Sequence, residues 1–137
     1  MNDQQIEQEI QAKGLTAPRV TPADIEANIA SEHYFTAHQS VFHDDAVQIY
    51  HDESAFDGDG ALRLLTFCVL VLRNGFTVTG ESACASPENF DAELGRKIAR
   101  QNAIQKLWPL MGYELKERLH LASISKAEAE KKGEVKA

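Results

Sequence analysis

Long apolar runs are missing from this sequence of 137 residues. A helix that spans a membrane needs about 20 predominantly apolar residues, so we expect no membrane span. The N-terminus, MNDQQIEQEI, also has neither the basic block nor the apolar block of a signal peptide. We therefore expect a cytoplasmic protein that is neither secreted nor attached to a membrane.

Cysteine is scarce as well. Only Cys68 and Cys84 occur, and their spacing is not that of metal ligands. Isolated thiols in an intracellular protein are typically buried and reduced, so we expect no disulfide. The histidines form no metal-binding pattern either; they are His33, His38, His43, His51 and His120. We expect neither a metal nor a cofactor.

Positive charge is in the minority, because 14 Lys and Arg stand against 21 Asp and Glu, which gives a net charge of -7. A protein that binds duplex DNA needs a broad basic surface to neutralise phosphates. The charge balance therefore excludes duplex nucleic acid as an expected partner, and any cationic site must be local. The length and the 43% apolar content fit one small globular core.

Catalytic motifs are also missing. The sequence has no nucleophile elbow and no glycine-rich loop that would cradle phosphates. Ser82 and Cys84 have no identifiable base beside them. We therefore expect a protein that is not an enzyme.

The clearest feature that is present is a β-hairpin in RLLTFCVLVLRNGFTVTGESACA, where Asn74-Gly75 predicts a type I′ turn between two strands. With Arg73 opposite Phe76, one face is predicted to be core: Leu65, Phe67, Val69, Val71, Phe76, Val78 and Cys84. The other face carries Thr66, Cys68, Leu70, Leu72, Thr77, Thr79 and Glu81. That second face is apolar on one strand and polar on the other, which fits an oligomer interface, a ligand floor or a half-covered sheet.

A long helix is predicted after the hairpin, with Ser86 as N-cap, Pro87 at its first position and Pro109 at its end. An apolar stripe is predicted to face the core, formed by Phe90, Leu94, Ile98, Ile104 and Trp108, with Ala92, Ala99 and Ala103 towards the opposite side. Arg96 and Arg100 lie one turn apart on the border of this stripe, with Lys97 inside it.

These cations have two interpretations. Their stems can cover apolar surface while Glu93 pairs with Lys97 or Arg96, which is a purely structural role. Alternatively, two stacked guanidinium groups and an ammonium group at the rim of a cleft can grip an anion such as phosphate.

The rest of the chain is predicted to be a helix from Asn2 or Asp3 to Gly14, a helix capped by Thr21 and Asp24, a weak strand near Val47 to Tyr50, and a short helix from Tyr113 to Leu121. Residues 1–18 are expected to form an N-terminal helix and linker, residues 19–121 a single domain, and residues 122–137 a flexible charged tail. The fold class is α+β, with a long antiparallel hairpin packed on the long helix and flanked by shorter helices.

The segment LRNGFTVTGESACASPENFDAELGRKIARQNAIQKLWPLMGYELKERL and the upstream VTPADIEANIASEHYF resemble a small phage protein family, typified by the phage N4 gene 49 and phage Sf6 gene 66 products. The resemblance covers roughly residues 19 to 119, and its most specific part is NGF-TVTGES-A followed by GRKIAR. It implies a phage protein that works in the host bacterial cytoplasm. The family label implies no activity.

The chain also resembles the phage counter-defence proteins called Thoeris anti-defence protein 1, which are similar in size and pack a hairpin on helices. This resemblance implies an oligomer, a homodimer or larger, that sequesters a cyclic ADP-ribose isomer or a cyclic oligonucleotide without degrading it. Those proteins use an arginine pair one helical turn apart, with hairpin residues that include an aromatic. The matching or nominated ligand-binding residues here are Arg96, Arg100, Lys97, Phe67, Phe76, Thr77 and Thr79.

Two other classes stay open. The protein could block a host or defence protein by direct binding, in which case nucleotides should not affect it. It could instead be an enzyme that degrades a nucleotide, in which case altered ligand should be released after heat denaturation.

Overall fold

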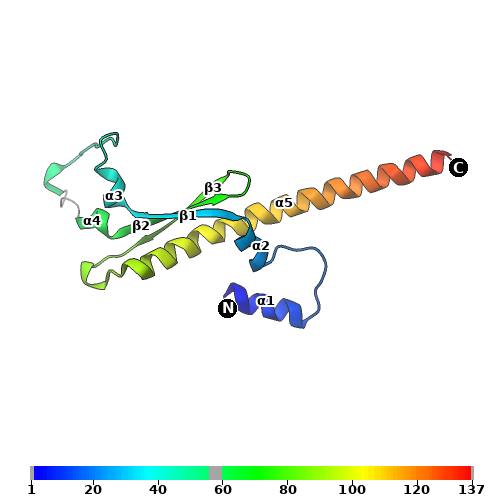
Figure 1. Ribbon diagram of the computed structural model, residues 1–137, viewed down its shortest axis with the longest axis horizontal. Helices are drawn as coiled ribbons and strands as arrows, with labels where there is room; N and C mark the ends of the chain where they lie inside the picture. The colour runs from blue at the N-terminus through cyan, green and yellow to red at the C-terminus, as the bar shows by residue number, and fades with distance from the viewer. Residues whose placement is uncertain (1, 56–59, 137) are drawn as a thin grey trace. The chain divides into compact units, whose positions relative to one another are not determined.

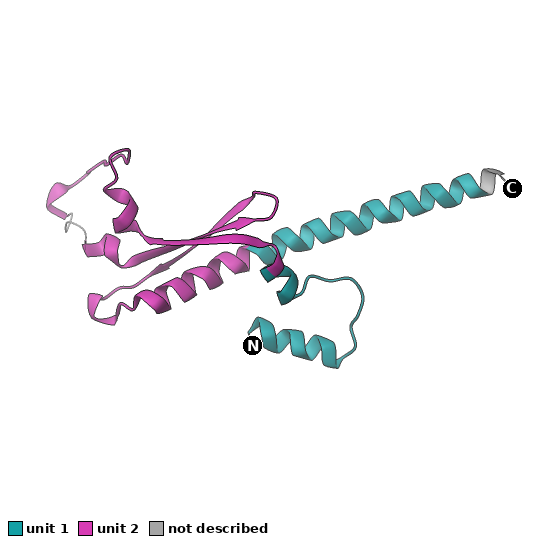
Figure 2. Ribbon diagram, in the orientation of Figure 1, with its two compact units in different colours: residues 1–26, 107–137 teal, residues 27–106 magenta. Residues whose placement is uncertain are grey.

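The computed structural model describes residues 2–55 and 60–136. The chain forms two compact units, residues 1–26 with 107–137 and residues 27–106 (Figure 2). This division does not follow the expected domain bounds 1–18, 19–121 and 122–137, which stay a prediction. The two units are described separately below.

The unit of residues 27–106 is built on an antiparallel sheet with the strand order β1-β2-β3 in the described part of the chain. The strands are β1 Ile29–Thr36, β2 Leu65–Leu72 and β3 Thr77–Ala83. Short helices follow β1 and precede β2: α3 Ala37–Val41, the 3-10 turn η1 Glu53–Ala55 and α4 Gly60–Arg63. The 3-10 turn η2 Pro87–Asn89 then leads to the helix α5 Ala92–Lys136. The first part of α5 lies along one face of the sheet (Figure 1), so the predicted α+β fold is confirmed.

The hairpin between β2 and β3 closes differently from the prediction. Leu72 N–H donates to Phe76 O at 2.8 Å, and Gly75 N–H donates to Leu72 O at 2.9 Å, so Arg73, Asn74 and Gly75 form the loop. Gly75 has a φ of 87°, and no described residue other than a glycine has a positive φ. A type I′ turn needs positive φ at both central residues, so that prediction is wrong; three-residue loops of this kind place glycine in the left-handed region.

The register of the hairpin is therefore shifted by one residue. Val78 pairs with Leu70 and not with Val71. Because side chains alternate along a strand, this slip moves every side chain of β3 to the other face relative to β2. The predicted core face is wrong on β2 and right at Val78 on β3: the buried side chains of the hairpin are Thr66, Cys68, Leu70, Leu72 and Val78. Gly80 lies on the same face.

The third strand, β1, was not predicted. Its register places Phe35 opposite Phe67, and their rings stack with centroids 5.4 Å apart. A weak strand was expected near Val47 to Tyr50 instead, but the described structure has no strand there. Val47 and Ile49 are 82% and 76% exposed, so the β-forming side chains of that segment have no sheet to pack on.

Helix α5 packs on the sheet through its small side chains. Ala99 and Ala103 are fully buried, and a Cβ atom at Gly80 would overlap the Ala99 carbonyl oxygen and the Ala103 nitrogen. The predicted core stripe is therefore wrong at Leu94 and Ile98, which are 53% and 39% exposed. Close approach of the two backbones requires residues without bulk, and this outweighs the apolar periodicity.

The bounds of α5 also differ from the prediction. Pro87 belongs to η2, and the helix begins at Ala92, where the Leu94 N–H donates to Asp91 Oδ1 at 3.0 Å. It continues through Pro109 to Lys136, so the predicted end at Pro109 is wrong. Proline inside a helix removes one backbone hydrogen bond at a cost of about 3 kcal/mol, which the good helix formers on both sides of Pro109 offset. The short helix predicted from Tyr113 to Leu121 and the tail residues up to Lys136 are therefore parts of α5.

The other unit contains α1 Asp3–Ala12, α2 Pro22–Ala27 up to residue 26, and the second part of α5. Both predicted caps are confirmed. Asn2 and Gln5 form a capping box at α1, and Thr21 and Asp24 bond reciprocally before α2 at 2.9 and 3.1 Å. No helix of the described residues is long and apolar enough to cross a bilayer.

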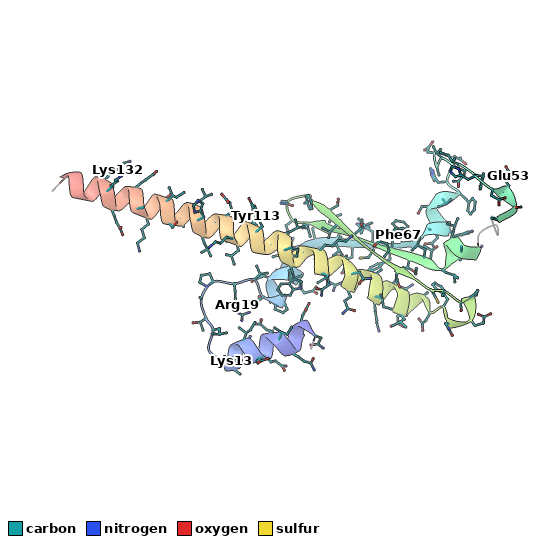
Figure 3. The ribbon with its side chains drawn as sticks, turned by 180° about the vertical axis from the view of Figure 1, so that it is seen from behind. Lys13, Arg19, Glu53, Phe67, Tyr113 and Lys132 are labelled. Carbon is teal, nitrogen blue, oxygen red and sulfur yellow. The ribbon has the colours of Figure 1, made fainter. Side chains whose placement is uncertain are left out.

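Within this unit, Arg19 donates to both oxygens of Glu7 at 2.6 Å. Trp108 Nε1 donates to Asp3 Oδ2 at 3.1 Å. These bonds tie α1 to the linker that follows it and to the second part of α5. Side chains of the unit are drawn in Figure 3.

Both cysteines are free, as expected. Cys68 is fully buried, and burial raises the pKa of its thiol. Cys84 is only half-buried. The expectation of buried thiols is thus confirmed for Cys68 alone.

Candidate functional site

Arg96 and Arg100 lie one turn apart on the same flank of α5, beside its buried row of small residues. Arg96 is exposed and Arg100 is half-buried. This flank faces β1, because Arg100 Nε donates to Glu32 Oε1. The opposite flank faces β3, where the Asn102 side chain donates to the Glu81 carbonyl oxygen at 2.8 Å. The arginine pair therefore lies at the β1 edge of the helix-covered face of the sheet.

Glu32 and Tyr34 complete a small polar cluster with Arg100. They are two residues apart on β1 and therefore share a face of the strand. The Tyr34 hydroxyl donates to Glu32 Oε1, the same oxygen that Arg100 contacts, at 2.9 Å. One carboxylate oxygen of Glu32 thus accepts two hydrogen bonds, one of them from a cation.

The electrostatics of the cluster follow from these contacts. Burial works to raise the pKa of Glu32, but the hydrogen bonds from Arg100 and Tyr34 and the charge of Arg100 lower it, and the net shift is downward. Burial, and then the hydrogen bond to Glu32, raise the pKa of Tyr34. Glu32 is therefore an ionised carboxylate and Tyr34 a neutral hydroxyl at neutral pH.

Lys97 lies apart from this cluster. Its ammonium group is 3.2 Å from Glu93, one turn earlier on α5, and both side chains are 71% exposed. Lys97 therefore forms the ion pair with Glu93 that is expected for a purely structural role. Exposed pairs of this kind contribute little, about 0.3–0.5 kcal/mol.

The nominated hairpin residues lie elsewhere. Phe67, Thr77 and Thr79 point to the face of the sheet that α5 does not cover, since they alternate with the buried Cys68, Val78 and Gly80. Figure 3 marks the place of Phe67 on the sheet. Phe76 is exposed beside the hairpin turn. Within one chain, the structure therefore brings Arg96 and Arg100 together but does not bring Phe67, Thr77 or Thr79 to them.

Glu32 and Tyr34 were missed by the sequence analysis. The signal for them is weak but present: SEHYFT is rich in strand formers and alternates Glu32, Tyr34 and Thr36 with His33 and Phe35. Reading this stretch as a strand would have placed a carboxylate and a phenol on one face. It would not have predicted Arg100 as their partner, because that contact spans 68 positions of the chain.

Other candidate sites offer less. Among the residues described, no group of three or more His, Cys, Asp or Glu side chains could hold a metal ion. An open pocket of about 520 Å³ is present in the unit of residues 1–26 and 107–137. Its lining is Gln11, Leu15, Thr16, Ala17, Pro18, Arg19 and Thr21, which includes none of the predicted ligand-binding residues.

The fold and the cluster together define a small α+β domain with a cationic pair on a helix that covers a three-stranded sheet. A family model, described as phage protein (N4 Gp49/phage Sf6 gene 66), matches residues 20–119, and the chain belongs to this family. The predicted family and its extent are thereby confirmed. Searches of curated proteins and of solved structures found no match. The weaker resemblance to Thoeris anti-defence protein 1 stays a prediction.

Proposed function

We propose that this phage protein binds a cyclic nucleotide immune signal, a cyclic ADP-ribose isomer or a cyclic oligonucleotide, and sequesters it in the host bacterial cytoplasm. The observation that carries the proposal is the placement of Arg96 and Arg100 one turn apart on the flank of α5 that faces β1. The protein acts as an anti-defence, anti-Thoeris protein by holding the signal and does not degrade it.

The chemistry of the pair suits phosphate groups. Guanidinium groups present forked donors that match phosphate oxygens, and a hydrogen bond to a charged group contributes about 1.5–3 kcal/mol. Tyr34 adds an aromatic ring near Arg100, which a base or ribose can contact. The net charge of -7 confines anion binding to this local site.

A second copy of the chain is part of the proposal. Phe67, Thr77 and Thr79 lie on the face of the sheet opposite to the arginines, so one chain cannot offer both sets to one small ligand. A homodimer or a higher homo-oligomer can bring the uncovered sheet face of one copy to the α5 flank of another. Apolar side chains on that face, such as Val69 and Val71, favour its burial against a second copy of the chain.

The experiment incubates the purified protein with cyclic ADP-ribose isomers and with cyclic di- and trinucleotides, and records the melting temperature and the mass of the ligand released by heating. A ligand-specific rise with an intact ligand is expected. Arg96→Ala should abolish the rise, whereas Lys106→Ala, which removes an exposed cation elsewhere on α5, should retain it. A rise with altered ligand would point to an enzyme, and no rise with any ligand would sink the proposal.

A second function, direct binding to a host or defence protein, is favoured by exposed apolar side chains on the surface. Leu94 and Ile98 form such a pair on α5, and Val47 and Ile49 another in the segment before α4. Exposed apolar groups of this kind mark interaction surfaces. A protein that acts this way should capture one host protein in a pull-down, should lose it on Ile98→Lys, and should not respond to nucleotides.

A further inference from the structure

Glu32 pairs with Arg100, so it competes with any external anion for that guanidinium group. The Glu32 side chain is 37% exposed and the Arg100 side chain 27% exposed, and the two form an ion pair between β1 and α5. The Tyr34 hydroxyl holds the same carboxylate oxygen at 2.9 Å. Tyr34, on the same strand, thus holds the carboxylate in place while the carboxylate pairs with the guanidinium group of Arg100.

The neighbouring arginine differs in this respect. Arg96 forms no ion pair with any of the residues that the structure describes, and its side chain is exposed. The pair therefore consists of one cation that is open to solvent and one that already holds an internal anion. An external anion gains the full interaction with Arg96, but at Arg100 it has to displace Glu32 or lie beside it, against like-charge repulsion.

We propose that Glu32 is an internal competitor that makes the Arg96 and Arg100 pair selective for ligands with two linked phosphate groups. A single phosphate cannot offset the lost bond between Glu32 and Arg100, so it binds weakly. A diphosphate is anchored at Arg96, and its second group then meets Arg100 at a high effective concentration and displaces the carboxylate. This inference rests on the proposed function, because it assigns Glu32 a part in the same site.

A competing carboxylate has a physical advantage in a cytoplasm that is rich in phosphate. Two stacked arginines without a counter-ion would hold inorganic phosphate or any mononucleotide. An internal carboxylate lowers the affinity for all anions but lowers it most for those that reach only one arginine. Selectivity then comes from a competing group built into the site, and not from added contacts to the ligand.

The test compares inorganic phosphate with inorganic pyrophosphate by isothermal titration calorimetry on the full chain. The parent protein should bind pyrophosphate at least tenfold more tightly than phosphate. Glu32→Gln keeps the shape and the acceptor oxygen but removes the charge, so it should tighten phosphate binding about tenfold and reduce the preference for pyrophosphate. Glu81→Gln is the matched control, because it removes one carboxylate from a strand of the same sheet on the face away from α5.

The outcomes separate this inference from the proposed function. If pyrophosphate binds and Arg96→Ala abolishes the binding, but Glu32→Gln binds phosphate no more tightly than the parent, the internal-competitor role is wrong and the anion site stands. Weaker binding by Glu32→Gln would likewise overturn it, because Glu32 would then hold Arg100 in place for the ligand. Binding of neither anion by either protein overturns both ideas.

A second readout does not depend on the stability of the variant. The Arg100 Nε–H group bonds to Glu32 in the free protein, so its NMR resonance should move when pyrophosphate is added and stay unchanged with an equal concentration of phosphate. A resonance that is unmoved by saturating pyrophosphate would show that Glu32 is not displaced.

Discussion

Gly80 on β3 lies directly against the backbone of Ala99 on α5, so closely that a Cβ atom at position 80 would lie 2.9 Å from Ala103 Cα and would overlap the Ala99 carbonyl oxygen. The obstacle is backbone, which cannot rotate out of the way. This contact fixes the distance between helix and sheet, and through it the position of the arginine flank beside β1.

The first prediction is that Gly80→Ala lowers the free energy of unfolding by about 3 kcal/mol or more, because it overpacks a contact between two backbones. Urea denaturation monitored by circular dichroism measures the change. Gly112→Ala is the matched control: it makes the same chemical change on α5 where a Cβ meets no atom within 4 Å, and it should stabilise the protein by about 1 kcal/mol through helix propensity. Equal effects of the two changes would contradict the close contact.

The same contact explains why the helix was only partly predictable. Periodicity located α5 and put Arg96 and Arg100 on one border, and both features are observed. It failed on the core face because the pattern assumes that the largest apolar residues face inward. Here Leu94 and Ile98 are exposed because Gly80 leaves room only for alanine. A glycine opposite a helix cannot be inferred from the helix sequence alone.

The sheet was predictable in type and not in register. Asn74-Gly75 located the hairpin, but the same sequence is compatible with a two-residue and with a three-residue loop. The choice between them shifts the register by one residue and so exchanges the two faces of one strand relative to the other. That choice decided where Phe67 points: the predicted register put it on the core face, whereas the observed register puts it on the face that α5 does not cover, away from the arginines. The ion pair of Glu32 with Arg100 needed a tertiary structure, because its two residues belong to a strand and a helix far apart in the chain.

The second prediction concerns the hairpin loop. Gly75 has a φ of 87°, a conformation that side chains with a Cβ rarely adopt. Gly75→Ala should therefore lower the free energy of unfolding by about 1–2 kcal/mol, although no atom lies within 4 Å of the added carbon. Gly75→Asn should cost less, because asparagine tolerates this region better. Chemical denaturation of both variants checks the order, and a larger loss with asparagine would contradict the loop conformation.

The third prediction is a pH dependence at the Glu7–Arg19 pair. The hydrogen bond from Arg19 is the largest cause that lowers the pKa of Glu7 from 4.5 to about 2. Because the folded-state pKa is the lower one, the pair stabilises the fold above the unfolded value near 4.5, and this contribution is lost as the pH falls towards 2. A carboxyl NMR titration should give a Glu7 midpoint near 2.

The control for this prediction is on the same helix. Glu7→Gln should reduce the loss of stability between pH 5 and pH 3, whereas Glu9→Gln, which removes an exposed carboxylate paired with Lys13, should leave that loss close to the parent value. The two variants have the same net charge. Identical profiles for both would show that the bidentate contact with Arg19 does not persist in solution.

The last prediction separates binding from stability at the arginine pair. Arg96 is exposed, so Arg96→Ala should change the free energy of unfolding by no more than about 0.5 kcal/mol. Arg100→Ala leaves the Glu32 carboxylate, whose side chain is 37% exposed, without its cation, and the loss of this largely solvated ion pair should lower stability by up to about 1 kcal/mol. The double variant Glu32→Gln with Arg100→Ala should recover part of that loss, since no unpaired carboxylate remains.

A thermal-melt series on the parent, the two single variants and the double variant measures these differences, and the coupling between positions 32 and 100 follows from the cycle. A coupling near zero would mean that the ion pair between Glu32 and Arg100 is absent in solution. If the coupling is present, a loss of nucleotide binding in Arg96→Ala reports on the site itself, because this change leaves the fold intact. The same loss in Arg100→Ala reports on binding and folding together, so Arg96 is the position at which the sequestration proposal is tested most directly.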